Sequence, residues 1–434
     1  MKRLLFWTLT VLFIGCKEKT SPLEIPAPIG QSYTLDTLDL SEKNYYDKVL
    51  GALVGSAIGD AMGASTEMWS RKDIQLKYGY ITTLTPAVRQ QSPEGTWDHN
   101  LIAGATTDDT RWKYAMVKYL SLNKESLSAT NFANFITDYY ASLTKTISDN
   151  DAVPETDFLD TQIEKIDWIK EWARVSMAYQ KDTEAYLKAM NRFYGGEMSC
   201  AGQLYTPMFG LISNNPEDAY NLAYEHTLFD LGYAKDISAL VSAMTHMALR
   251  TTNMDSIINT ATFIDPLGYQ DSRLVGRISY NMADASVKKV LAIKQLVLAD
   301  TLTAKDSILF KIPEGFNGPQ KEWTRQELAY QFLEENEKAI PFHSGEIWQI
   351  LITALQYGEG DFEKTLQFIV NYGRDNDTVA AVAGMILGAK EGYSNLPVTL
   401  RTQALKVNKE NMGIDLEALA LEMVEKKHIN FPNP

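Results

Sequence analysis

Apolar residues in this chain recur at intervals of three and four, which is the spacing of side chains along one face of an α-helix. Such stripes occupy residues 112–120, 237–248 and 347–355, and the pattern continues through 362–370 and 379–389. Alternation with a period of two, which would indicate half-buried strands, is scarce. We therefore expect an all-α fold, a compact domain built from many packed helices.

The chain is long enough for a sizeable core, since 45% of its 434 residues are hydrophobic. We place the domain at residues 45–430. Within it, 251–335 is less regular and contains breaker signals such as Asp265-Pro266 and Asn317-Gly318-Pro319, so this part is predicted to be an insertion or lid. The formal net charge of −14, without a basic patch, argues against a nucleic-acid partner.

The N-terminus has the features of a secretory signal. Lys2 and Arg3 precede an uncharged, mostly apolar run that ends at Gly15-Cys16 and is too short to cross a bilayer comfortably. The residues before Cys16 resemble a bacterial lipobox, in which the cysteine thiol is acylated. Residues 1–16 are therefore predicted to be a lipoprotein signal peptide; an ordinary signal peptide that releases the protein into the periplasm is the alternative.

An acylated Cys16 would anchor the chain to a membrane without spanning it. Lys17 stands where an inner-membrane retention signal has Asp, which favours the outer membrane of a bacterial cell envelope. Residues 17–44 contain three prolines and little periodicity, so we predict a flexible tether.

Two clusters of acids and hydroxyls stand directly before apolar stripes. They are Thr107-Asp108-Asp109-Thr110 and Asp375-Asn376-Asp377-Thr378. Asp and Thr favour helix N-termini, so helix capping is the simplest interpretation. A cap needs one acceptor, however, whereas each cluster offers two acids and a hydroxyl among small or apolar neighbours.

Several ionised carboxylates near a core are costly unless a cation or a proton compensates them. Oxygen donors without nearby His or Cys select a hard divalent ion such as Mg²⁺ or Mn²⁺. The acids outnumber those that one ion needs, which makes a two-ion site plausible. The spacing along the chain does not show whether the two clusters meet.

A third motif is the small-residue stretch 51–64, GALVGSAIGDAMGA. Together with 107–110 (TDDT) and 373–389 (GRDNDTVAAVAGMILGA), it resembles the ADP-ribosylglycohydrolase family, which includes the dinitrogenase reductase-activating glycohydrolase. The order and spacing match from about Tyr45 to Pro397. The resemblance implies a compact all-α fold with two Mg²⁺ or Mn²⁺ ions between helix N-termini, and hydrolysis of N- or O-glycosidic bonds to ADP-ribose.

The same resemblance implies site residues. It gives Glu67 a place on a mobile loop beside the metals, as a ligand, gate or general base, and His246 a contact with the substrate ribose. A hydrogen-bonded core histidine is the alternative for His246. Asp60 is interpreted as structural, and Cys200 as a small buried residue. The implied metal ligands are Thr107, Asp108, Asp109, Asp375, Asp377 and Thr378.

The chain departs from the family pattern in two places. The family carries a Gly-Asn-Gly loop followed by Met-Arg and Pro, which resembles a phosphate and ribose cradle; here residues 198–207 keep Pro207 but lack the Asn, one Gly and the Arg. Arg374 also replaces the second Gly of a Gly-Gly-Asp sequence. These changes leave the metal chemistry in place and call a diphosphate-bearing substrate into question.

Three hypotheses follow. The first is a binuclear metal hydrolase that releases ADP-ribose, with Glu67 or Asp108 activating water, acting on an ADP-ribosylated protein or an ADP-ribose-like small molecule. The second is a hydrolase of the same fold acting on another ribosyl glycoside or nucleotide outside the cytoplasm. The third is a noncatalytic metal-dependent binding protein. In each case the only predicted membrane contact is the lipid at Cys16.

Overall fold

The computed structural model describes residues 41–88, 100–123, 127–148, 156–297 and 310–425. The regular structure of these residues is helical, and β-type pairing is confined to isolated bridges, so the all-α prediction is confirmed. The predicted signal peptide with Cys16 lies outside the described residues, as does most of the tether.

The helices follow one another in this order: α1 (Glu42–Gly63), α2 (Arg71–Tyr78), α3 (Asp108–Leu122), α4 (Ala129–Ser148), α5 (Thr156–Lys181), α6 (Thr183–Phe193), η1 (Ala201–Leu204), α7 (Pro207–Ile212), α8 (Pro216–His226), α9 (Tyr233–Arg250), α10 (Met254–Phe263), η2 (Tyr269–Asp271), α11 (Ile278–Gln295), α13 (Gln320–Glu334), α14 (Ser344–Gly358), α15 (Phe362–Tyr372), α16 (Asn376–Glu391), η3 (Tyr393–Asn395), α17 (Val398–Glu410) and α18 (Leu416–Glu425).

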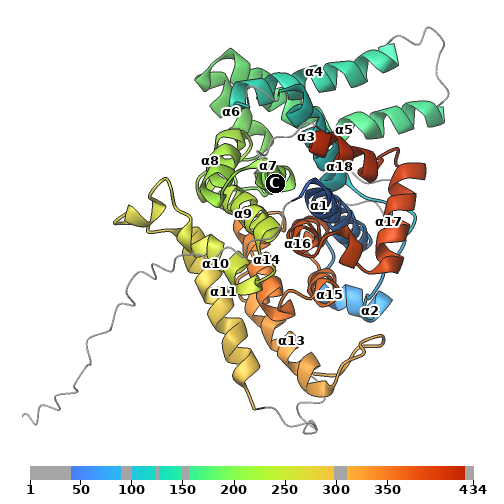
Figure 1. Ribbon diagram of the computed structural model, residues 1–434, viewed down its shortest axis with the longest axis vertical. Coiled ribbons are helices and arrows are strands. Elements are labelled where there is room, and N and C mark those ends of the chain that lie inside the picture. Colours follow the sequence, from blue (N-terminus) through green and yellow to red (C-terminus); the bar gives the residue numbers. More distant parts are fainter. Residues whose placement is uncertain (1–40, 89–99, 124–126, 149–155, 298–309, 426–434) are drawn as a thin grey trace, which may run out of the picture. The chain divides into compact units, whose positions relative to one another are not determined.

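Two helices distant in sequence, α1 and α16, lie side by side among the others (Figure 1). Glycines recur every four residues along the facing side of α1, and a Cβ atom on them would strike the α16 backbone. On Gly55 it would lie 2.2 Å from the Gly384 carbonyl oxygen, and on Gly59 it would lie 1.9 Å from that of Ala380. The two backbones therefore approach closely at these glycines, which carry no side chain that would hold the helices apart.

The pairing of α1 with α16 is antiparallel, which decides where the acids end up. A Cβ atom on Gly63, the last residue of α1, would lie 2.3 Å from the Cα of Asp377 in the first turn of α16. The C-terminal end of α1 thus meets the N-terminal end of α16. Helix α3 also packs against both α1 and α16, so its own N-terminus reaches the same place.

The apolar stripes predicted from the sequence form the buried faces of α3, α9, α14, α15 and α16. Helices α9, α14 and α15 pack against α16, while α17 and α18 pack against α1. The segment 251–335 contains α10, α11 and α13, and these pack against α9 and α14; its role as an insertion or lid stays a prediction. Helix α1 begins at Glu42, inside the end of the predicted tether.

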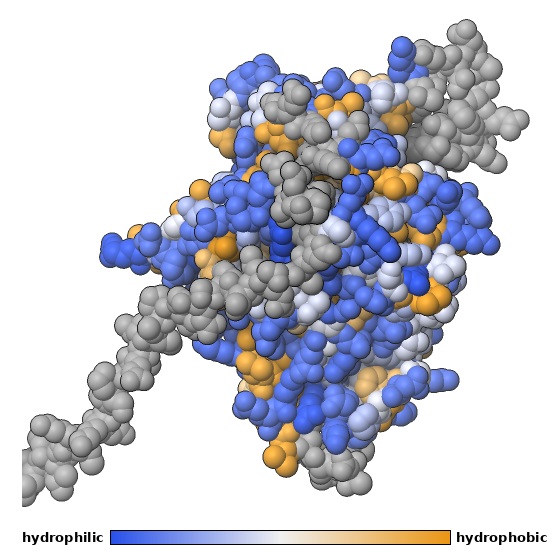
Figure 2. All heavy atoms as spheres, viewed as in Figure 1, coloured by the Kyte–Doolittle hydropathy of each residue, from blue (hydrophilic) through white to orange (hydrophobic). Residues whose placement is uncertain are grey.

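The face of the molecule in Figure 2 is mainly hydrophilic, with apolar side chains scattered over it. Within the described ranges, no helix combines the length and the apolar character needed to cross a membrane.

Candidate metal centre and active site

Asp60, in the last turn of α1, binds the N-terminus of α3. Its Oδ1 accepts the Thr107 backbone N–H at 2.9 Å, and its Oδ2 accepts the Thr110 backbone N–H at 3.0 Å and the Thr110 hydroxyl at 2.6 Å. These bonds satisfy donors that a helix start leaves open. Burial, and then repulsion from Asp109, raises the pKa of Asp60 to about 7. This geometry supports the structural interpretation of Asp60.

The N-terminus of α16 is built differently. Asp375 occupies the N-cap position, but its side chain makes no capping hydrogen bond. The next residue, Asn376, holds the turn in place by donating to the Thr66 hydroxyl at 2.8 Å and to the Val370 carbonyl at 3.1 Å. Within the described part of the chain, Oδ1 of Asp377 is buried without a hydrogen-bond partner.

The two acidic clusters do meet. The Thr107 hydroxyl donates to Oδ2 of Asp377 at 3.3 Å, and the Thr378 hydroxyl donates to Oδ2 of Asp109 at 3.0 Å. Each cluster thus supplies a threonine to an aspartate of the other. The structure therefore brings together the two clusters that contain the six residues predicted as metal ligands, which sequence spacing alone could not show.

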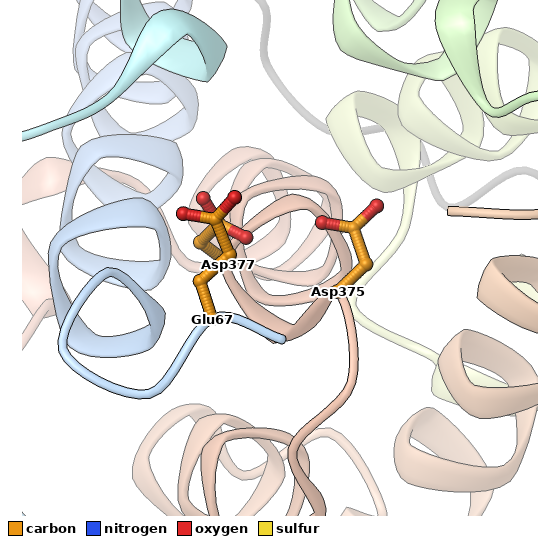
Figure 3. Close-up of side chains that lie close together, drawn as sticks. All are labelled: Glu67, Asp375 and Asp377. Atoms are coloured by element: carbon orange, nitrogen blue, oxygen red, sulfur yellow. The ribbon is translucent and has the colours of Figure 1, made fainter. Parts of the chain in front are cut away.

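Glu67 joins this group from the loop after α1. One carboxylate oxygen from each of Glu67, Asp375 and Asp377 lies within 4.8 Å of the others. Figure 3 shows the Glu67 loop meeting the start of α16. We call Glu67, Asp375 and Asp377 the acid triad.

The Glu67 loop is tied to the Asp375 loop by two backbone hydrogen bonds. The Met68 N–H donates to the Arg374 carbonyl at 2.7 Å, and the Arg374 N–H donates to the Trp69 carbonyl at 2.9 Å. Met68 and Arg374 both adopt positive φ angles, 63° and 64°, which non-glycine residues seldom do. Strain of this kind marks positions where the surrounding structure fixes the backbone.

Burial and mutual repulsion dominate the electrostatics of the site. The pKa values of Asp375 and Asp377 are raised well above the ordinary value, first by burial and then by the negative charge of Glu67. The pKa of half-buried Asp108 rises to about 7, because it is removed from water and lies close to Asp109 and Glu67. Carboxylates gathered in this way, with one buried oxygen unpartnered, fit a hard divalent cation.

Asp109 has a partner that the sequence reasoning missed. Lys113 lies one turn further along α3, its Nζ is 3.2 Å from Oδ1 of Asp109, and both side chains are 1% exposed. The available signal was the spacing, since residues four apart on a helix face each other. A lysine inside an apolar stripe, next to Trp112, was a second sign.

Cys200 is buried, as predicted, but it also contacts the acid triad. Its thiol donates to Oδ2 of Asp375 at 3.5 Å. Cys200 precedes η1, in the segment where the family has its Gly-Asn-Gly loop. In that segment the Gly202 N–H donates to Oδ1 of buried Asp230 at 2.8 Å, so a carboxylate of the protein itself occupies this backbone donor.

His246 lies in the interior of α9. Its Nδ1 is 3.1 Å from the Gly210 carbonyl oxygen, its exposure is 1%, and burial lowers its pKa to about 4. This is the geometry of a neutral, hydrogen-bonded core histidine. The predicted contact with a substrate ribose stays a prediction.

Comparisons with known proteins bear on the family and the fold. A protein of Escherichia coli strain K12, described as uncharacterized protein YegU, is 21% identical over 374 residues, which cover 86% of this chain and 96% of that protein. A solved structure titled ADP-ribosylglycohydrolase-related protein complex shares the fold, with a TM-score of 0.50 and 18% identity over 89% of this chain and 99% of that one. The family model for ADP-ribosylglycohydrolase matches residues 41–431, and the chain therefore belongs to the ADP-ribosylglycohydrolase family.

Proposed function

We propose that this family member is a divalent-cation-dependent hydrolase that cleaves an N- or O-glycosidic bond to ADP-ribose. Family membership supports a glycohydrolase activity in general. The observation that carries the finer proposal is the convergence of the acid triad with the acids of α3 where two helix N-termini meet.

The acid triad is the proposed ligand set for a divalent ion. Its donors are all oxygens, its aspartates are buried, and Oδ1 of Asp377 lacks a partner among the described residues. Oxygen-only ligands favour Mg²⁺ or Mn²⁺ over softer metals. Such an ion would supply positive charge that orients ribose hydroxyls and stabilises charge developing at the scissile centre. A second ion, which the sequence predicts, would need Asp109 and its neighbours as ligands.

The residues proposed to handle protons are Asp108 and Glu67. Asp108 is half-buried at the start of α3 and lies close to Glu67, so its carboxylate is placed to accept a proton from water at the acid cluster. Glu67 is also half-buried and lies on a loop. One of them would take a proton from water as the water oxygen bonds to the anomeric carbon. The glycosidic bond then breaks, and the leaving nitrogen or oxygen takes up the proton that the carboxylate received from water.

A second candidate is a hydrolase of another ribosyl glycoside. The specific observation is the η1 segment, whose backbone donors are used inside the protein: the Gly202 N–H binds Asp230 and the Cys200 N–H binds the Phe342 carbonyl at 2.9 Å. A segment whose backbone donors are engaged in this way offers fewer hydrogen bonds to a diphosphate.

The proposed location for either activity is the cell envelope, with the chain held by a lipid on Cys16.

The test supplies Mn²⁺ or Mg²⁺ to the purified protein and measures products by chromatography. Substrates are proteins ADP-ribosylated on arginine or on serine, compared with nucleosides and dinucleotides. Release of ADP-ribose that is lost in Asp375→Ala and retained in Asp218→Ala, an exposed acid on α8, is the expected result. Turnover of nucleosides alone would favour the second candidate. Equal ADP-ribose release by wild type and Asp375→Ala would contradict the proposed site.

A further inference from the structure

The acid cluster contains a built-in cation. The ammonium group of Lys113 is 3.2 Å from Oδ1 of Asp109, and both side chains are 1% exposed. Lysine is almost never fully buried unless it is paired. The negative charge of Asp60 also acts on this lysine, so the ammonium lies within the cluster rather than at its edge.

Both carboxylate oxygens of Asp109 are already occupied by donors. Oδ1 accepts from Lys113, and Oδ2 accepts from the Thr378 hydroxyl at 3.0 Å. A divalent ion bound to Asp109 through a remaining lone pair would stand next to the Lys113 ammonium, and the two positive charges would repel each other. With its side chain buried on the inner face of α3, that ammonium has no path to water without repacking the helix.

The aspartates of the acid triad have no such cation. Within the described residues, no ion pair joins Asp375 or Asp377 to a lysine or arginine, and Oδ1 of Asp377 is unpartnered. The nearest basic residue in sequence, Arg374, is turned to Glu346 instead, at 2.6 Å. Charge compensation is therefore present on the α3 side of the cluster and lacking at the start of α16.

We infer that the Lys113 ammonium takes the place of a second divalent ion beside Asp109, so that the chain binds one divalent ion, at the acid triad. This inference rests on the proposed function, because it assumes that the acids hold a metal. In place of the two-ion site predicted from the sequence, the cluster would then hold one exchangeable divalent ion and the ammonium group of Lys113.

The experiment measures the number of Mn²⁺ ions bound by the chelator-stripped full-length protein. Equilibrium dialysis with metal analysis gives the stoichiometry, and electron paramagnetic resonance detects spin-coupled Mn²⁺ pairs. Wild type is expected to bind one ion without spin coupling. Lys113→Met, which frees Asp109, is expected to bind two. Lys118→Met is the matched control, since Lys118 is on the same helix but pairs with Glu422.

A double variant keeps the test decisive if Lys113→Met does not fold. Asp109→Asn with Lys113→Met removes both charges of the ion pair together and is expected to retain one Mn²⁺ with affinity within about ten-fold of wild type. Asp377→Asn is expected to bind none. Loss of the ion in the double variant, or a folded Lys113→Met that still binds one, would overturn the inference.

Activity separates this inference from the proposed function. One Mn²⁺ per wild-type chain without glycosidic cleavage would support the single-ion site and contradict the hydrolase proposal. Two ions with cleavage would overturn the single-ion site and leave the hydrolase proposal standing. No ion at all would overturn the inference together with the metal dependence.

Discussion

The N-termini of α3 and α16 begin with nearly the same residues, but the structure uses them differently. At α3 the open backbone donors are bound by Asp60, and Asp109 is neutralised by Lys113. At α16 the N-cap side chain of Asp375 makes no capping bond, and Asp377 keeps an oxygen without a partner among the described residues. The comparison shows that acids before a helix are paired inside the protein at α3 and left without a cation of the protein at α16, and only the second arrangement leaves oxygens open to a ligand.

The largest effect is expected when the corresponding aspartates at the N-termini of α3 and α16 are each replaced by asparagine. In chelator, Asp109→Asn should lower the free energy of unfolding by about 3–5 kcal/mol, because it leaves the Lys113 ammonium buried and unpaired. Asp377→Asn should raise it by roughly 1 kcal/mol at pH 8, because the amide needs no proton and removes repulsion within the acid triad. Urea denaturation monitored by circular dichroism measures both.

The control for this contrast is Asp361→Asn, an exposed helix N-cap at the start of α15. It should change the free energy of unfolding by less than about 1 kcal/mol, since Asn and Asp cap equally well. If Asp109→Asn and Asp377→Asn shifted stability in the same direction, the two ends would not differ in charge balance as described.

The second prediction concerns the close contact between α1 and α16. Gly59→Ala places a methyl group 1.9 Å from the Ala380 carbonyl oxygen, so α1 and α16 must move apart. Overpacking of this kind costs roughly 1–3 kcal/mol or more, and the displaced α16 should also bind Mn²⁺ more weakly. Thermal unfolding and Mn²⁺ titration measure the two effects.

Gly345→Ala is the matched control for Gly59→Ala. Its new methyl group would lie 3.0 Å from Cε of Met282 and 3.1 Å from the hydroxyl oxygen of Tyr233, which are the outer ends of side chains and not backbone atoms. Stability should stay within about 1 kcal/mol of wild type. Unchanged stability in Gly59→Ala would show that the helix contact does not hold the two acid clusters together.

The third prediction concerns pH. The pKa values of Asp60 and Asp108 are about 7 in the folded protein, and those of Asp375 and Asp377 are also raised. Between the ordinary aspartate pKa and about 7, the folded state binds more protons than the unfolded state. The metal-free protein therefore loses stability from these groups as pH rises through that window. A divalent ion replaces the protons, so stabilisation by Mn²⁺ should grow from pH 5 to pH 8.

Two buried histidines act in the opposite direction. Burial lowers the pKa values of His226 and His246 to about 4, so their contribution is lost as pH falls from about 6.5 toward 4. They titrate in both metal states, so the measured quantity is the difference in melting temperature with and without Mn²⁺ at each pH. This difference should rise by several degrees toward pH 8. A flat profile would mean that the ion does not compete with protons at these acids.

The helices and the residues of the candidate site were predictable from the sequence, for a physical reason. Apolar spacing reports which face of a helix is buried, whereas the close approach of α1 and α16 at their glycines is seen only in the structure. The burial of the Lys113–Asp109 pair and the contact of Cys200 with Asp375 were not predictable, because both depend on how separate segments pack. Nor did the sequence show that Asp60 would bind the start of α3.

The smallest expected effect comes from the loop that carries Asp375. Arg374 adopts a φ of 64°, while its guanidinium donates to both oxygens of Glu346, at 2.6 and 3.0 Å, and to the Lys338 carbonyl at 2.8 Å. Arg374→Gly relieves about 1–2 kcal/mol of backbone strain and loses bonds to a charged group worth about 1.5–3 kcal/mol. The net loss of stability should therefore be about 1 kcal/mol.

Arg374→Ala keeps the strained φ angle and loses the same bonds, so its free energy of unfolding should be lower than that of Arg374→Gly. In a Glu346→Gln background, either substitution should lower the free energy of unfolding by less. Because the Arg374 side chain fixes the loop whose backbone pairs with the Glu67 loop, both variants should bind Mn²⁺ roughly ten-fold more weakly, an effect typical of residues that orient metal ligands. The Lys113–Asp109 ion pair should be unaffected, because both residues lie on α3 and not on the loop that carries Arg374. Equal stability of the Gly and Ala variants would show that residue 374 carries no strain, and unchanged Mn²⁺ affinity would show that the acid triad is positioned without this arginine.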